Sequence, residues 1–147
     1  MPVSKALRSL LKIRHLQEGQ EKAALDSALG YLNAVENAIG NSKNREREAR
    51  EQITQDGSED AEIAFRSSDL QSSIEHQRQS VLAVQQSQTQ ERVDLARADY
   101  LSRRMERRQA EIVVEGAQKR EEAVAGRRLQ RSIDDWFNAR ERKDDET

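Results

Sequence analysis

The only proline in this 147-residue chain is Pro2, so nothing between Val3 and Thr147 obliges the backbone to leave a helix. A proline inside a helix removes a hydrogen bond, clashes with the preceding turn and costs about 3 kcal/mol relative to alanine. A chain without such a breaker is free to form helices much longer than the usual length of about 10–14 residues.

Residues that favour a turn gather in one place, between Thr54 and Asp60. There Gly57 tolerates the left-handed conformation past a helix end, and Ser58 or Asp60 can cap the next helix. We therefore predict a helix over about residues 4–55, a turn at 56–60, a second helix over about 61–141 and a frayed tail at 142–147. Three glycines of the first helix each cost about 1 kcal/mol relative to alanine and predict local softness: Gly19, Gly30 and Gly40.

The composition excludes a wide hydrophobic core. Hydrophobic residues make up 35% and aromatic residues only 3% of the chain, whereas a compact domain is usually about 45–50% apolar. Disorder is the alternative for a chain of low hydrophobicity. However, 25 basic and 27 acidic residues leave a net charge of only −2, and this composition with little proline is typical of long helices.

Apolar residues follow a heptad pattern in both predicted helices, which indicates a coiled coil. In the first helix the pattern runs through Leu25, Ala28, Leu32, Val35, Ile39, Ala49 and Ile53, with Ser42 and Glu46 in the same register. Closer to the N-terminus it shifts to Leu7, Leu10 or Leu11, Ile13 and Leu16, which predicts a stutter near Gly19. In the second helix it runs through Ile63, Leu70, Ile74, Val81, Val84, Leu95, Ala98, Met105 and Ile112.

Polar residues interrupt the second pattern at Gln77, Gln88, Glu91, Ser102 and Gln109. Such residues can specify the register at a cost in stability, which would leave the hairpin dependent on a partner. Long coiled coils also tolerate them without any such role, and both interpretations stay open.

Folding the chain back at residue 58 predicts an antiparallel hairpin. Ile53 then lies opposite Ile63, and Ser4 lies opposite Ile112, where the clean pattern of the second helix ends. A parallel homodimer of one continuous helix does not predict this coincidence. The expected fold is all-α, with two long helices forming one elongated antiparallel coiled-coil domain over 1–147. The second helix is longer and overhangs the first.

Apolar residues return in the overhang, where no intramolecular partner is expected. They follow helical spacing and form a candidate docking face: Leu129, Ile133, Trp136 and Phe137.

Nothing in the sequence points to catalysis or to a cofactor. The chain has no cysteine, which excludes thiol nucleophiles and cysteine-ligated metals. His15 and His76 lack companions at metal-ligand spacing, so surface histidines are the expected reading. The longest strongly apolar run is Ile112 to Val114, too short to span a bilayer. With no signal-peptide pattern at the N-terminus, a cytosolic location is expected.

A basic run with four arginines and one glutamate lies at residues 103–108. The antiparallel register places it beside a basic N-terminal segment, residues 1–22. A solvated helix face, an acidic protein partner and a nucleic acid are the three readings. Nucleic-acid binding also favours a basic chain and aromatic stacking, which this sequence lacks.

Three segments resemble the FliJ family of flagellar export proteins. The Leu-rich, Lys/Arg-punctuated stretch at residues 7–16 and the following Ala-rich stretch at 21–25 resemble the opening of that family. The basic, acidic and apolar stretch at 127–140 resembles its closing segment. The resemblance extends to the YscO family, the injectisome counterpart.

The resemblance implies a soluble, non-catalytic stalk of a type III protein export apparatus, acting in bacterial flagellum biogenesis. Its partners would be the hexameric export ATPase, the cytoplasmic domain of the export-gate membrane protein and export chaperones. It would lie at the cytoplasmic face of the inner membrane through that apparatus.

The resemblance also implies residues for two contacts. The ATPase would contact Leu7, Leu11, Arg14, Ile133, Asp134, Trp136, Phe137 and Arg140. The export gate would contact Phe65, Leu70, Ser73, Ile74 and Gln77. The alternatives are a nucleic-acid-binding rod that uses the basic run and a homodimeric structural coiled coil.

Overall fold

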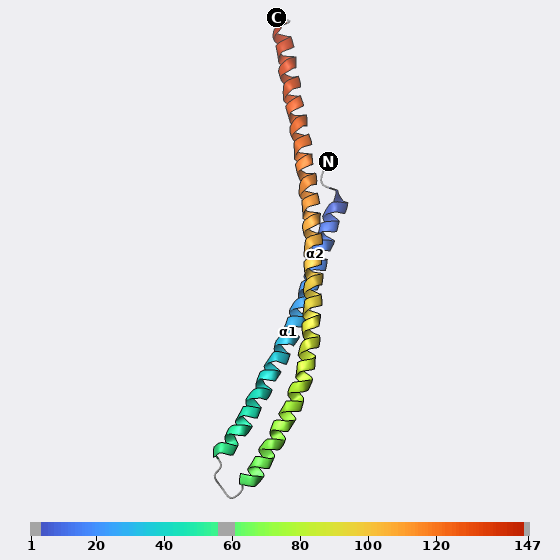
Figure 1. The fold of residues 1–147 in the computed structure, drawn as a ribbon. Coiled ribbons are helices and arrows are strands. Elements are labelled where there is room, and N and C mark those ends of the chain that lie inside the picture. Colours follow the sequence, from blue (N-terminus) through green and yellow to red (C-terminus); the bar gives the residue numbers. More distant parts are fainter. Residues whose placement is uncertain (1–3, 56–60, 146–147) are drawn as a thin grey trace. The chain divides into compact units, whose positions relative to one another are not determined.

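The computed structural model describes residues 4–55 and 61–145 and consists there of two helices (Figure 1). Helix α1 spans Lys5–Gln55 and helix α2 spans Ala61–Asp145. The two helices pack against each other and the second is the longer, which confirms the all-α hairpin. The predicted turn at 56–60 and the last two residues of the predicted frayed tail lie outside the described residues, whereas residues 142–145 belong to α2.

The contacts divide the chain into two units, which are described separately. The hairpin unit comprises Gln20–Tyr100. The base unit comprises the part of α1 up to Gly19 and the part of α2 from Leu101.

In the hairpin unit the two helices run antiparallel. Ser68 Oγ donates a hydrogen bond to the carbonyl oxygen of Ala49, at 2.8 Å. Ser42 Oγ donates to Glu75 Oε2, at 2.6 Å. A fold-back at residue 58 predicts that Ala49 lies opposite residue 67 and that Ser42 lies opposite residue 74. The observed partners, Ser68 and Glu75, are each one residue further along α2.

The predicted face of α1 is confirmed. Leu32, Ser42 and Glu46 are buried, and Leu25, Ala28, Val35, Ile39 and Ala49 are half-buried, while the side chain of Ile53 lies outside the described residues. The expected stutter near Gly19 is wrong, because the covered residues keep steps of four and three along the helix. They are Leu7, Leu11, Arg14, Glu18, Glu21 and Leu25. Leu10, Ile13 and Leu16 lie outside this series and are exposed.

The predicted face of α2 is wrong. Every residue of the predicted apolar pattern from Ile63 to Ile112 is exposed, including Ile63 at 70% and Leu95 at 67%. The face that packs on α1 lies one or two positions further along the chain. Its members are Ala64, Ser68, Ser72, Glu75, Gln79, Leu82, Gln86, Thr89, Val93, Ala96 and Tyr100 in the hairpin unit, and Arg103, Arg107, Ala110 and Val114 in the base unit. At about 100° per residue, this shift turns α2 by roughly 150°.

The physical reason lies in the polar residues of α1. Its packed face includes Ser42 and Glu46, and a carboxylate buried against Leu70 or Ile74 would lose its water without gaining a partner. The observed face of α2 instead brings Glu75 and Gln79 to these positions, and both form hydrogen bonds with α1. Satisfying the buried polar groups therefore outweighs burying the larger aliphatic side chains.

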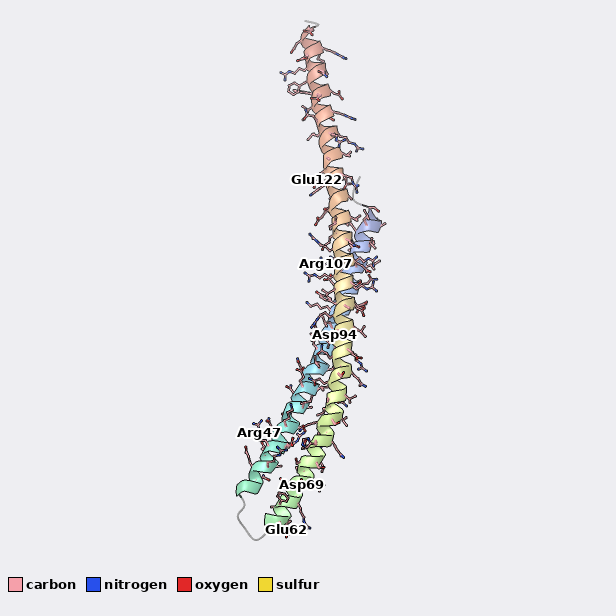
Figure 2. All side chains as sticks on the ribbon, viewed as in Figure 1. Arg47, Glu62, Asp69, Asp94, Arg107 and Glu122 are labelled. Carbon is pink, nitrogen blue, oxygen red and sulfur yellow. The ribbon has the colours of Figure 1, made fainter. Side chains whose placement is uncertain are left out.

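In the base unit, α1 again runs antiparallel to α2. Arg14 Nη1 lies 3.0 Å from Glu106 Oε2, and Arg103 Nη1 lies 3.4 Å from Gln17 Oε1. Partly buried residues of α2 continue to Glu121, and every residue from 122 to 145 is exposed. Residues 122–145 are called the overhang below; Figure 2 labels Glu122 at its start.

The glycines of the described helices are not needed for close packing. A Cβ atom added to Gly19, Gly30, Gly40, Gly116 or Gly126 would meet nothing within 4 Å. None of the described residues has a positive φ. Within the described residues, neither helix is long and apolar enough to cross a membrane.

The orientation of α2 predicts a contrast between two valines. Val93 is 1% exposed, whereas Val81 of the predicted pattern is 59% exposed. Val93→Ala should lower the free energy of unfolding by about 1.5–3 kcal/mol, the value of burying such a side chain, and Val81→Ala should change it by less than about 0.5 kcal/mol. Urea unfolding followed by circular dichroism measures both, and a larger effect at Val81 would contradict the observed face.

Candidate partner-binding surfaces and the buried carboxylates

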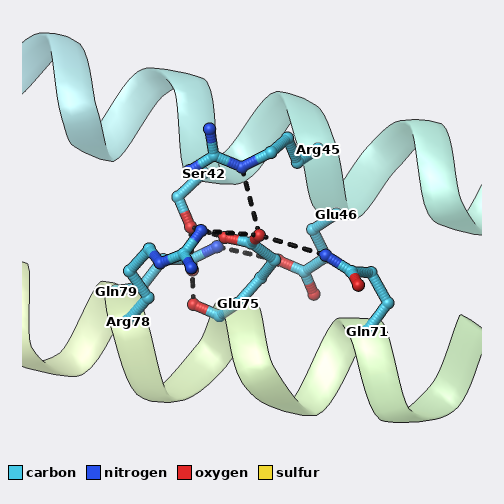
Figure 3. A network of polar contacts seen from close by, with 7 residues as sticks. All are labelled: Ser42, Arg45, Glu46, Gln71, Glu75, Arg78 and Gln79. Atoms are coloured by element: carbon cyan, nitrogen blue, oxygen red, sulfur yellow. Dashed lines mark hydrogen bonds and ion pairs between the residues drawn. The ribbon is translucent and has the colours of Figure 1, made fainter.

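The centre of the hairpin unit is a buried carboxylate on α2. Glu75 is 0% exposed and is surrounded by donors from both helices (Figure 3). Ser42 of α1 donates to its Oε2, while Arg45 of α1 and Arg78 of α2 reach its Oε1 at 3.1 and 3.0 Å. Gln71 Nε2 donates to the same oxygen at 3.3 Å. The charge is thus compensated by two guanidinium groups and further hydrogen bonds.

A second carboxylate lies beside it on α1. Glu46 Oε1 lies 2.7 Å from Arg50 Nη2 and 3.0 Å from His76 Nε2, and its Oε2 accepts a hydrogen bond from Gln79 at 3.0 Å. Ser72 Oγ also donates to Oε1, at 3.3 Å. His76 therefore is not an isolated surface histidine, although its side chain is 63% exposed.

These contacts hold both carboxylates in the charged form. The Ser42 hydrogen bond, followed by the interactions with Arg45 and Arg78, lowers the pKa of Glu75 below its ordinary value of 4.5 and outweighs the opposing effect of burial. The hydrogen bond from Gln79, followed by the charges of His76 and Arg50, lowers the pKa of Glu46 in the same way.

The base unit repeats the arrangement with arginines in the packed face. Arg107 contacts Glu18 of α1 and lies 2.6 Å from Glu111 Oε1. Arg108 reaches Glu111 Oε2 at 3.1 Å, and His15 Nε2 lies 3.8 Å from Oε1 of the same residue. The hydrogen bond from Arg107 is the main cause that lowers the pKa of Glu111.

Most of the basic run is therefore engaged within the protein. Three of its four arginines, Arg103, Arg107 and Arg108, form ion pairs with carboxylates of the base unit. A phosphate backbone would have to compete with those carboxylates. Among the described residues, no group of three or more acidic or histidine side chains is arranged to hold a metal ion.

The overhang gathers five of the residues expected to contact an ATPase. Trp136 and Phe137 are more than half exposed, and their rings meet edge to face with centroids 5.1 Å apart. The guanidinium carbon of Arg140 lies 5.4 Å from the centre of the Trp136 ring. Ile133 is 40% exposed, and Asp134 accepts a hydrogen bond from Gln130 at 3.2 Å. The result is an aromatic and cationic surface on one helix.

The other three expected ATPase contacts are not part of that surface. Leu7 and Leu11 are half-buried, and Arg14 is held by Gln17 at 3.1 Å and by Glu106. Glu106 precedes Ile133 by 27 positions on α2, or roughly 40 Å at about 1.5 Å per residue. The structure thus assigns these three side chains to helix packing in the base unit.

The residues expected to contact an export gate are all exposed on α2 of the hairpin unit. They are Phe65, Leu70, Ser73, Ile74 and Gln77. Leu70, Ile74 and Gln77 belong to the apolar pattern that was expected to pack on α1 and instead faces solvent.

The sequence placed Glu46 at a packed position of α1 but not Glu75 at one of α2, because the face of α2 was chosen by apolarity. The available signal was the presence of Ser42 and Glu46 at packed positions of α1, which required polar partners on α2.

The chain matches no protein-family model, and neither the curated proteins nor the solved structures include one similar to it.

Ser42 provides a test of the buried network. Ser42→Ala should lower the free energy of unfolding by about 1.5–3 kcal/mol, because it removes a hydrogen bond to a charged group. Ser27→Ala, an exposed serine of the same helix, is the matched control for the change in helix propensity. Equal stability of the two variants in urea unfolding would show that the Ser42 contact is not formed.

The carboxylates also predict a pH dependence. The pKa values of Glu46, Glu75 and Glu111 are lower in the folded chain than the ordinary 4.5. Their contribution is therefore present above pH 4.5 and is lost as the pH falls through the folded values, because the unfolded chain then binds more protons. Thermal unfolding measured between pH 7 and pH 3 should show a Tm that decreases once the pH is lower than about 4.5.

Ser42→Ala should flatten that acid dependence, because it raises the folded pKa of Glu75 toward its ordinary value. A Tm that stays constant across the acid range in the unmodified protein would contradict the assignment.

Proposed function

We propose that this protein is the stalk component of a type III export apparatus, with the overhang as its contact for the hexameric export ATPase. The proposal rests on the resemblance of residues 7–16, 21–25 and 127–140 to the FliJ family. A helical hairpin whose second helix is the longer is compatible with such a stalk.

Within the structure, the overhang is the observation that supports the ATPase contact. Trp136, Phe137 and Arg140 form an exposed surface of two aromatic rings and a guanidinium group. Tryptophan and arginine are enriched among residues that dominate binding energy at protein interfaces. Charged residues surround this group, so the segment is well suited to bind a protein partner reversibly.

The proposal gives the chain no chemical step of its own. Its buried carboxylates lie between two helices and are fully engaged in hydrogen bonds and ion pairs. Its effect on the ATPase would come from binding. In the same proposal, the exposed residues Phe65 to Gln77 of the hairpin unit face the cytoplasmic domain of the export gate, and export chaperones are further partners.

Removing the aromatic pair tests the ATPase contact. Trp136→Ala combined with Phe137→Ala should weaken binding to the export ATPase of the same organism by at least about tenfold, because each ring supplies interface area that no neighbour replaces. Tyr31→Ala combined with Phe65→Ala is the matched control, since it removes two exposed aromatic residues from the hairpin unit. Binding is measured by pull-down and interferometry, and ATP hydrolysis is followed in parallel.

Circular dichroism should show unchanged helicity for both variants, because all four side chains are exposed. Unchanged ATPase binding by the overhang variant would refute the assignment of this surface. A loss caused only by the control variant would move the contact to the hairpin unit.

A further inference from the structure

The outer face of α2 in the hairpin unit carries an apolar stripe, which Ser67, Gln77, Gln88 and Glu91 interrupt. Because α2 turns this face away from α1, six aliphatic side chains at heptad spacing are between 42% and 70% exposed. This outer stripe consists of Ile63, Leu70, Ile74, Val81, Val84 and Leu95. Single exposed aliphatic residues are normal, but a stripe of this spacing has the width and period of a coiled-coil contact.

We propose that a second copy of the chain binds this stripe, with the two α2 helices antiparallel. The stripe spans residues 63–95, and an antiparallel copy overlaps it along its whole length when Ile63 lies opposite Leu95. The same register places Ile74 opposite Val84, and each of these pairs occurs twice because the contact is two-fold symmetric. Leu70 then meets Gln88, and Val81 meets Gln77.

Charge complementarity supports this occupant and this orientation. In an antiparallel pair, a residue that flanks the stripe lies beside a residue at the same heptad position of the other copy. In this register Arg66 of each copy lies beside Asp94 of the other, so the two-fold axis gives two such pairs. Arg66 now pairs with Glu62 at 3.2 Å, and both side chains are more than three-quarters exposed. An exposed pair of this kind is weak, so Arg66 is free to change partners.

A parallel pair of helices lacks this match. Its flanking positions would bring Asp94 beside Asp99 of the other copy and would leave Arg66 beside Gln71, with no ion pair of opposite charge. The antiparallel pair has one like-charge contact, Arg78 with its own equivalent near the two-fold axis. Arg78 is already paired with the buried Glu75 at 3.0 Å, which reduces that repulsion. Flanking charges therefore favour the antiparallel orientation.

Self-association would be independent of the overhang, so it goes beyond the proposed ATPase contact. It would however cover Leu70, Ile74 and Gln77, which the proposed function assigns to the export gate. Binding a second copy and binding the gate would then be mutually exclusive.

Sedimentation of the purified full-length chain is the first test. The mass should rise from the 16.8 kDa of one chain toward twice that value as the protein concentration increases to about 100 µM. Val84→Glu should raise the dissociation constant by at least about tenfold, because it places two charges in the apolar contact. Ala83→Glu, the adjacent exposed residue outside the stripe, is the matched control and should leave it unchanged. A single-chain mass throughout, or equal effects of the two variants, would overturn the proposal.

Exchanging the charges of Arg66 and Asp94 tests both whether the dimer forms and whether these two residues lie side by side in it. Arg66→Asp and Asp94→Arg should each weaken the dimer, because each creates two like-charge contacts. The double variant should restore it, because the pair is re-formed with its signs reversed. These are exposed positions on one helix, and circular dichroism checks the fold. Failure of the double variant to recover the dimer would overturn this register.

Crosslinking gives a third readout, which is clean because the chain has no cysteine of its own. Ser80→Cys lies beside its own equivalent near the two-fold axis, so a short bismaleimide should link two copies. Ser87→Cys lies opposite Ser73 and, at about 1.5 Å per residue, is roughly 20 Å from its equivalent. Linkage at residue 87 as fast as at residue 80 would exclude the antiparallel arrangement.

Discussion

The compensation of buried carboxylates is the constraint on which the packing of this protein depends. Glu75 lies between the helices with no exposed surface, and its charge is balanced by Arg45 from one helix and Arg78 from the other. Removing one partner from a buried charge costs more than a typical hydrogen bond contributes. The helices must therefore meet in the arrangement that supplies donors, and aliphatic packing adapts to that arrangement.

This priority gives α2 two different faces. The face toward α1 contains serine, glutamate, glutamine and arginine together with a few aliphatic residues such as Leu82, Val93 and Ala110. The opposite face contains most of the larger aliphatic side chains and is open to solvent. Packing between the two helices thus relies on polar contacts, while many of the large aliphatic side chains are exposed. A hairpin of this kind buries few aliphatic side chains of its own.

The sequence was sufficient to predict both helices and the packed face of α1, but not the packed face of α2. The absence of proline after Pro2 and the turn residues near Gly57 predicted both helices, and α1 begins and ends within one residue of its predicted bounds. The face of α1 followed from apolar spacing, because Leu25 to Ile39 are also its packed residues. The face of α2 could not be obtained in that way, because the choice depends on pairing Glu75 with donors from the other helix. Of the expected ATPase contacts, those in the overhang are exposed, whereas Leu7, Leu11 and Arg14 pack within the base unit.

The glycines of the two helices lie at positions where an added side-chain atom would contact nothing. None of the five in the described residues has a neighbour that a methyl group would touch, so alanine at any of them would stabilise its helix by about 1 kcal/mol without altering a contact. The stability of each helix can therefore vary at these positions while the packing between α1 and α2 stays the same.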